Sequence, residues 1–280
     1  MNFWWNLSWL PSFTGWVLVL IGILGAGYYF WRKAREEHYN LVTAFDGLIV
    51  ASLLGLWAAR ASYLLLQTDW SGFFWWRFFN LWSYPGMWAP AGLVTSYLFL
   101  IWTGRRLKRD SFEIWDFYTL ALVWFLGWWW LSRFVVGAAA GTATNLPWGI
   151  VFPQRVEPAH PVQIYAAAAY LLLFRYLWWA EPRFRFFIWY RSKKRTAKPG
   201  YLLAVFLIFS GLLGIGLSFL QYPFVMIFDF EISQFFSMAQ FILGCVVLYV
   251  RSGQSFFVKK EKGKHVTPFA STNTGTENNS

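Results

Sequence analysis

The sequence predicts an all-α integral membrane protein with seven transmembrane helices. Of its 280 residues, 58% are hydrophobic and only 13% are charged, whereas about a quarter of the residues of a soluble domain are charged. Seven windows are each mostly apolar over roughly the 20 residues that a bilayer-crossing helix needs. The windows do not alternate polar and apolar residues as barrel strands do, and helices satisfy their own backbone groups in lipid.

The windows lie at residues 14–31, 42–66, 88–104, 114–133, 162–180, 200–220 and 233–251, and the third is the shortest. Ahead of them, MNFWWNLSWLPSF is rich in tryptophan, so we expect residues 1–13 to form an amphipathic arm at the membrane interface. Residues 14–251 form the seven-helix domain. Residues 252–280 are polar and rich in lysine, which predicts a disordered cytoplasmic tail.

Basic residues set the orientation of these helices. Most of the 24 Lys and Arg residues follow the first, third, fifth and seventh windows. The positive-inside rule makes those connections cytoplasmic, with the N-terminus outside and the C-terminus inside. The net charge of +11 therefore records topology, and we expect no nucleic-acid partner because the chain has no soluble basic face. Glu113 and Asp116 open the fourth window, where acidic residues favour a helix N-terminus.

Ionisable side chains near the outer ends of the windows suggest a binding site, because such groups are costly in a membrane. Arg60 lies in LWAARASYLLL with Tyr63 on the same helix face, and Arg133 closes the fourth window. Arg155 and His160 lie at a similar depth. Guanidinium groups grip phosphate oxygens two at a time, so we expect Arg60, Tyr63 and Arg133 to bind an anionic lipid headgroup. The alternative is that each arginine pairs locally or extends to the interface.

The connection NLPWGIVFPQRVEPAHPVQIY, residues 145–165, differs from the apolar windows on either side. Its prolines bias the preceding residues toward extended conformations, and a proline after the histidine suits the first turn of the next helix. The residues expected to shape the loop and the helix start are Leu146, Pro147, Trp148, Pro161, Gln163 and Tyr165. We favour a structural role for His160, in which it holds the loop in place, over a role as a catalytic base. Both roles stay open.

The stretches LPWGIVFP and HPVQIY resemble those of the prolipoprotein diacylglyceryl transferases. The resemblance extends to seven spans, a Gly-Met turn before the third span and an Arg-x-x-Tyr late in the second, matched by Arg60 and Tyr63. It implies a bacterial inner-membrane enzyme in which the thiolate of a lipobox cysteine attacks the glycerol carbon of phosphatidylglycerol, and glycerol phosphate leaves. The implied partners are phosphatidylglycerol or another anionic phospholipid and the signal peptides of prolipoproteins.

The chain departs from the family pattern at several positions that carry polar or ionisable residues there. RFVVGAAAG, residues 133–141, stands where the family has Gly-Arg-x-x-Asn-Phe-x-Asn-Gly-Glu. The other substituted positions are Pro90-Ala91-Gly92 for His-Gly-Gly, Ala166 for a glutamate, and Gly214, Ser218 and Gln221 for an arginine, a glutamate and an arginine. These substitutions leave open whether the chain is an enzyme.

Three functions are therefore considered. The first is a divergent diacylglyceryl transferase that uses Arg60, Arg133 and His160. The second is a catalytically degenerate relative that binds phospholipid or precursor without transfer. The third, a transporter, is disfavoured because the sequence shows no self-similar halves. None of these readings calls for a metal or a cofactor.

Overall fold

A computed structural model of the protein describes residues 10–67, 75–80, 86–153, 155–183, 199–223 and 225–252. The long helices in chain order are α1 (Leu10–Glu36), α2 (Leu41–Gln67), α4 (Ala89–Leu107), α5 (Ser111–Val136), α6 (Val162–Pro182), α8 (Tyr201–Ser218) and α9 (Ile232–Ser252). Each predicted window coincides with one of them. Short elements join them: the helix α3 (Trp75–Phe79) and the antiparallel strands β1 (Met226–Ile227) and β2 (Phe230–Glu231).

Most of the predicted interfacial arm and of the predicted tail lies outside the described residues. The arm's last residues, from Leu10 on, are the first turn of α1. The helix therefore starts earlier than the apolar window suggests and also runs five residues past it, to Glu36.

Five of the long helices are long and apolar enough to cross a membrane: Ser12–Glu36, Leu41–Gln67, Ser111–Val136, Tyr201–Ser218 and Ile232–Arg251. The chain is thus an all-α, multi-pass membrane protein. Helices α4 and α6 are not in this set, and each carries polar residues that the bundle covers. Ser96 and Thr103 of α4 and Gln163 and Glu181 of α6 are all buried.

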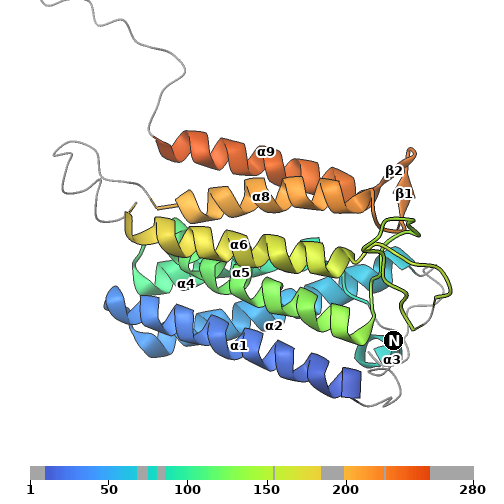
Figure 1. Ribbon diagram of the computed structural model, residues 1–280. Helices are drawn as coiled ribbons and strands as arrows, with labels where there is room; N and C mark the ends of the chain where they lie inside the picture. The colour runs from blue at the N-terminus through green and yellow to red at the C-terminus, as the bar shows by residue number, and fades with distance from the viewer. Residues whose placement is uncertain are drawn as a thin grey trace, which may run out of the picture.

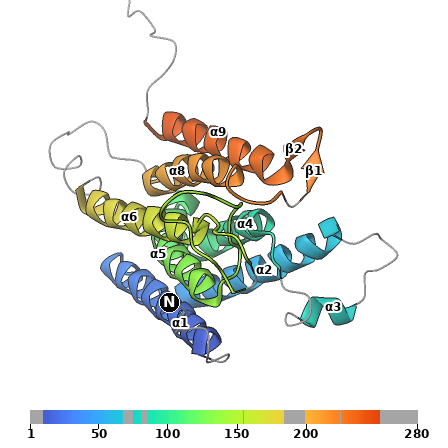
Figure 2. The same ribbon diagram turned by 45° about the vertical axis from the view of Figure 1, so that its right-hand side comes forward.

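Helix α5 lies at the centre of the bundle and packs against α1, α4, α6 and α8, while α9 pairs with α8 and α4 pairs with α2 (Figures 1 and 2). The helices run alternately up and down. One end of the bundle, called the loop end here, therefore gathers α3, residues 137–161 and the β1–β2 hairpin (Figure 1). The opposite end, called the basic end, holds the C-terminal ends of α1, α4 and α9, with Lys33, Arg106 and Arg251.

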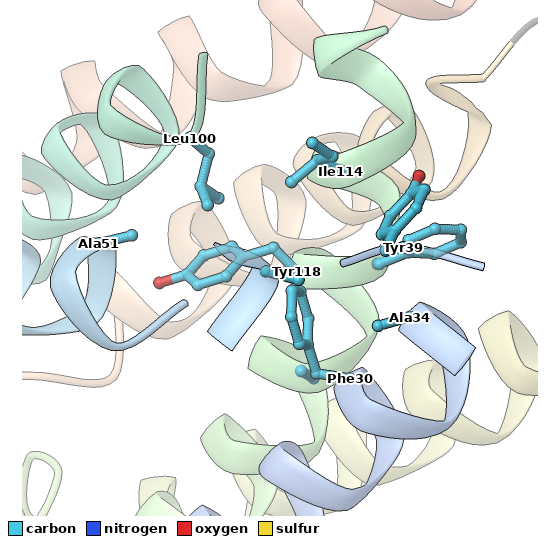
Figure 3. Packing of buried hydrophobic residues seen from close by; sticks show 10 residues of the cluster. Phe30, Ala34, Tyr39, Ala51, Leu100, Ile114 and Tyr118 are labelled. Atoms are coloured by element: carbon cyan, nitrogen blue, oxygen red, sulfur yellow. The ribbon is translucent and has the colours of Figure 1, made fainter. Parts of the chain in front are cut away.

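An aromatic and aliphatic core joins the first four long helices. Phe30 of α1, Ala51 of α2, Leu100 of α4 and Ile114 and Tyr118 of α5 are each at most 5% exposed and converge in one cluster (Figure 3). Small residues at the α2–α4 contact allow close approach: a Cβ atom added to Gly92 would lie 2.7 Å from the carbonyl oxygen of Gly55. Small residues at helix interfaces are a common means of packing helices in membranes.

The basic end is fastened by polar contacts between helices that are distant in sequence. The Asp116 carboxylate of α5 accepts hydrogen bonds from the backbone N–H groups of Gly200, at 2.7 Å, and Leu203, at 2.9 Å. Asp116 thus caps the N-terminus of α8, where unpaired N–H groups favour an acceptor with negative charge. Nearby, Lys33 of α1 and Glu181 of α6 form a buried ion pair.

Candidate functional site

The loop that joins α5 to α6 is compact because its backbone groups bond to one another. The Gly141 N–H donates to the carbonyl of His160, and the His160 N–H donates to the carbonyl of Thr142, each at 3.0 Å. Ile150 and Ala159 exchange a second pair of hydrogen bonds. The loop lies over the ends of α5 and α6 (Figure 2). Because its backbone groups are paired, the loop has a defined structure, and it is called the loop platform here.

Two residues of the helix-start motif, Tyr165 and Gln163, join the loop platform to other segments by hydrogen bonds. The Trp148 indole N–H donates to the Tyr165 hydroxyl oxygen at 2.8 Å, which ties the loop tip to α6. The Gln163 side-chain amide donates to the carbonyl of Ala138 at 2.7 Å and is fully buried. Pro147 lies inside a turn closed by a hydrogen bond from the Gly149 N–H to the Leu146 carbonyl. Pro161 directly precedes α6.

His160 lies between the loop and α6, with its ring 6.4 Å from that of Tyr165. Its Nδ1 atom is buried and makes no hydrogen bond within the described part of the chain, and the same holds for Oε1 of Gln163. Leaving a buried polar atom unpaired costs about 1–3 kcal/mol. Each of these atoms could bond to water or to a polar ligand group.

Arg60 is buried and bonded to three backbone carbonyls. Its guanidinium donates to the carbonyls of Phe78 at 3.2 Å, Gly86 at 2.8 Å and Arg77 at 2.5 Å. The Tyr63 ring lies under the guanidinium at 5.9 Å and packs closely against Gly86. At Gly86 φ is +150°, a conformation that L side chains rarely adopt. The Arg-x-x-Tyr pattern and the Gly-Met turn noted in the sequence thus meet in space.

Arg133 occupies a different setting near the end of α5. Its guanidinium lies over the ring of Trp129 at 5.9 Å, and it makes no hydrogen bond or ion pair within the described ranges. The partners of Arg60 lie on α3 and at Gly86, whereas that of Arg133 lies one turn away on its own helix. No contact recorded among the described residues joins the two arginines.

A cavity of about 520 Å³ opens at the loop end. Its walls come from the end of α5, the loop and the residues after α8: Trp130, Gly137, Ala138, Ala139, Ala140, Phe152, Arg155, Gln221 and Tyr222. Arg155 donates to the carbonyl of Gly141 at 2.8 Å and stacks on the Tyr222 ring at 4.8 Å. The sequence marked Arg155 only as one of several cations at this depth. Nothing in the sequence linked it to Gln221 and Tyr222, which are more than 60 residues away.

Several positions where the family pattern has ionisable residues are filled by small side chains under tight packing. Ala166 is completely buried. A Cβ atom added to Gly214 would lie 2.4 Å from the Ser237 hydroxyl oxygen. Ser218 donates to the carbonyl of Ile215 and accepts from the Gln234 amide. Neighbouring groups therefore leave no room for larger side chains at these two positions, and a glutamate at 166 or an arginine at 214 would require them to move.

Comparison with known proteins decides the family. The family model described as prolipoprotein diacylglyceryl transferase matches residues 16–250, from α1 to α9. The chain belongs to the prolipoprotein diacylglyceryl transferase family. The resemblance carried by LPWGIVFP and HPVQIY is thereby confirmed, and the identities given below make this chain a divergent member.

Curated relatives of this diacylglyceryl transferase family member bear the name phosphatidylglycerol–prolipoprotein diacylglyceryl transferase. The Aeromonas hydrophila subsp. hydrophila protein is 25% identical over 180 residues, which are 61% of this chain and 60% of the relative. That of Pseudomonas putida (strain W619) is 31% identical over 178 residues, 58% and 63% of the two chains. That of Bordetella parapertussis is 28% identical over 214 residues, 73% and 72%. The chain thus spans less than two thirds of the first two relatives.

Proposed function

We propose that this protein transfers the diacylglyceryl group of phosphatidylglycerol to the lipobox cysteine of exported prolipoproteins at the bacterial inner membrane. The observation that carries the proposal is the family match over residues 16–250, together with the relatives that bear this activity in their names. The loop that holds the LPWGIVFP and HPVQIY motifs borders the cavity through Phe152 and Arg155.

The proposal includes a full topology of seven spans, in which α4 and α6 cross the membrane beside the five more apolar helices. The basic end would face the cytoplasm, since cytoplasmic connections carry the excess of lysine and arginine. The cavity would then open toward the outer leaflet, where exported precursors arrive.

In the proposed reaction a C–S bond forms between the precursor thiolate and the glycerol carbon, and the C–O bond to the phosphate breaks. Glycerol phosphate takes the electron pair, and a base accepts the thiol proton. His160 is the proposed base, supported by its Nδ1, which makes no hydrogen bond in the described part of the chain. The reaction needs no metal or cofactor.

Arg60, Tyr63 and Arg133 are proposed to contact the lipid headgroup. Three of the five N–H groups of Arg60 are engaged by carbonyls, so the remaining two and the fixed Tyr63 ring could border the ligand. Arg133, whose guanidinium contacts only an aromatic ring among the described residues, is the freer of the two arginines. The attraction between a guanidinium and a phosphate is stronger at a site that is partly shielded from water.

The test is complementation of a bacterial strain depleted of its own transferase. Expression of this chain is expected to restore a thioether-linked diacylglyceryl group on the lipobox cysteine, measured by mass spectrometry of a reporter prolipoprotein. The His160→Gln variant, expressed to the same level, is expected to lower the modified fraction at least tenfold. Absence of the adduct despite wild-type expression in the membrane would rule out the transferase.

A second candidate function is phospholipid binding without transfer. It is supported by the small residues packed at positions 166 and 214, where the family pattern has a glutamate and an arginine. The same experiment separates the two candidates. An unmodified reporter, together with phosphatidylglycerol that co-purifies with the protein, would favour the binding role.

A further inference from the structure

We propose that Arg155 and the turn Gly137–Ala140 form a phosphate-binding site in the loop-end cavity. The ligand is a phosphate ester, either the phosphodiester of a lipid headgroup or the phosphomonoester of free glycerol phosphate. The choice of these ligands rests on the proposed function. The site itself does not require that transfer takes place, because a non-catalytic relative would hold the same group.

Arg155 is fixed along one edge and open along the other. Its Nη1 atom donates to the Gly141 carbonyl at 2.8 Å and lies 3.5 Å from the Tyr222 hydroxyl. The guanidinium stacks on the Tyr222 ring at 4.8 Å. Its Nε and Nη2 groups make no hydrogen bond within the described ranges. A guanidinium oriented by stacking loses little entropy when it binds, and its free edge matches two phosphate oxygens.

The turn after α5 supplies backbone donors to the same cavity. Gly137 and Ala138 donate their N–H groups to the carbonyls of Phe134 and Arg133, which closes the helix. The next two N–H groups, of Ala139 and Ala140, have no acceptor among the described residues, although both residues line the cavity. Gly137, with φ +73°, and Ala139, with φ +62°, are left-handed. Successive N–H groups in such turns bind anions.

The remaining wall is compatible with an anion. Gln221 lines the cavity, and its side-chain amide makes no hydrogen bond in the described part of the chain, so it can donate to a ligand oxygen. None of the described lining residues is acidic, and Arg155 is the cation among them. Trp130 and Phe152 lower the local polarity, which strengthens a charge-assisted contact. The cavity volume is within the range of small-molecule sites.

Arg155 is not part of the motifs through which the chain resembles its family, and it lies on the proline-rich loop between them. The 133–141 segment, which lacks the polar residues of the family pattern, supplies backbone N–H groups instead. The inferred site therefore uses backbone donors and a loop arginine where side chains have been lost.

The test uses the full chain in phosphatidylcholine nanodiscs, with two probes. Glycerol phosphate is titrated directly and followed by calorimetry. Phosphatidylglycerol is supplied at a few per cent of the nanodisc lipid, and its retention is read by native mass spectrometry against phosphatidylcholine. Arg155→Gln is expected to weaken binding about tenfold or more, and Arg155→Lys, which keeps the charge but loses the planar fork, by a smaller factor.

Arg106→Gln is the matched control, because Arg106 stacks on Trp102 at 4.5 Å at the basic end of the molecule. It should bind as the wild type does. If Arg155→Gln loosens the loop, Gln221→Leu provides an independent variant that breaks no hydrogen bond within the described chain and should still weaken binding several-fold. Loss of phosphatidylglycerol alone in Arg155→Gln supports a headgroup site, and loss of both probes supports a site for the phosphate ester itself.

The proposal is overturned if the wild type binds neither probe, if Arg155→Gln binds both as the wild type does, or if Arg106→Gln loses as much. These outcomes do not depend on the complementation result. If the wild type modifies the reporter cysteine and Arg155→Gln still binds both probes, the proposed transferase activity is supported and the phosphate site is ruled out. If Arg155→Gln loses binding but the wild type leaves the reporter unmodified, the phosphate site is supported and the transferase activity is ruled out.

Discussion

The Arg60 guanidinium on α2 donates a 2.8 Å hydrogen bond to the carbonyl of Gly86, three residues before α4 begins. Two more bonds from the same group reach carbonyls on α3. A single buried charge therefore links three parts of the loop end. The carbonyls are partial negative charges in a site with little water, so each bond to the guanidinium is stronger than a neutral hydrogen bond.

Replacing Arg60 by alanine is expected to destabilise the protein by about 3 kcal/mol or more, because three buried carbonyls lose their donor. Arg60→Lys should have an intermediate effect, since an ammonium group cannot span three carbonyls in a fixed fork. Thermal unfolding in detergent measures both. Arg106→Ala, an exposed arginine at the basic end, is the control. If Arg60→Ala unfolds at the same temperature as the wild type, water must bond to these carbonyls in the variant, and the prediction is wrong.

Asp116 supports the start of α8 from another helix, and a variant can isolate this effect. Asp116→Asn keeps the shape but removes the negative charge and one acceptor, so it should cost about 1–2 kcal/mol. Amide hydrogen exchange in peptides that cover residues 199–205 should become faster, because one of the N–H groups of Gly200 and Leu203 loses its acceptor and the other keeps only an uncharged one. Asp46→Asn, on an exposed position of α2, should leave that exchange unchanged. Equal rates in both variants would contradict the cap.

The helices could be predicted from the sequence because hydrophobicity is local. Each apolar window needs no partner to be recognised, and all seven coincide with long helices. The short α3, Trp75–Phe79, was not predicted. It is part of an aromatic connection and is tied down by Arg60 through bonds that span 17 and 18 residues. Local propensity does not report such a contact.

The site was less predictable for the same reason. Asp116 matches the acidic residues expected in the first turns of its own helix, yet its hydrogen-bonding partner Gly200 is 84 residues away. The cavity is bounded by the end of α5, the loop and the residues after α8, and only packing brings these together. The loop motif itself was recognisable, because prolines and a helix start leave a local pattern.

The buried ion pair between Lys33 and Glu181 has a length of 2.7 Å, and both side chains are less than 10% exposed. Glu181→Leu is expected to cost about 3 kcal/mol, because among the described residues Lys33 then keeps only the exposed Glu36 as a charged partner. The double variant Lys33→Met/Glu181→Leu should recover most of this loss, since two apolar side chains replace two desolvated charges. A double-mutant cycle on thermal unfolding gives the coupling. Additive effects would show that the pair is not coupled.

Ala139 gives the most local prediction, because its φ of +62° is left-handed. A residue with an L side chain is destabilised by about 1–2 kcal/mol in this conformation, and glycine is not. Glycine, however, gives the unfolded chain more backbone entropy, which offsets part of the gain. Ala139→Gly should therefore stabilise the protein by about 0.5–1 kcal/mol. The neighbouring Ala138 has no positive φ, so Ala138→Gly should destabilise by a similar amount. Thermal unfolding of the two variants in one detergent compares a single substitution at adjacent positions, and shifts of the same sign would contradict the left-handed turn. Because Ala139→Gly keeps both backbone N–H groups, glycerol phosphate should bind this variant with unchanged affinity.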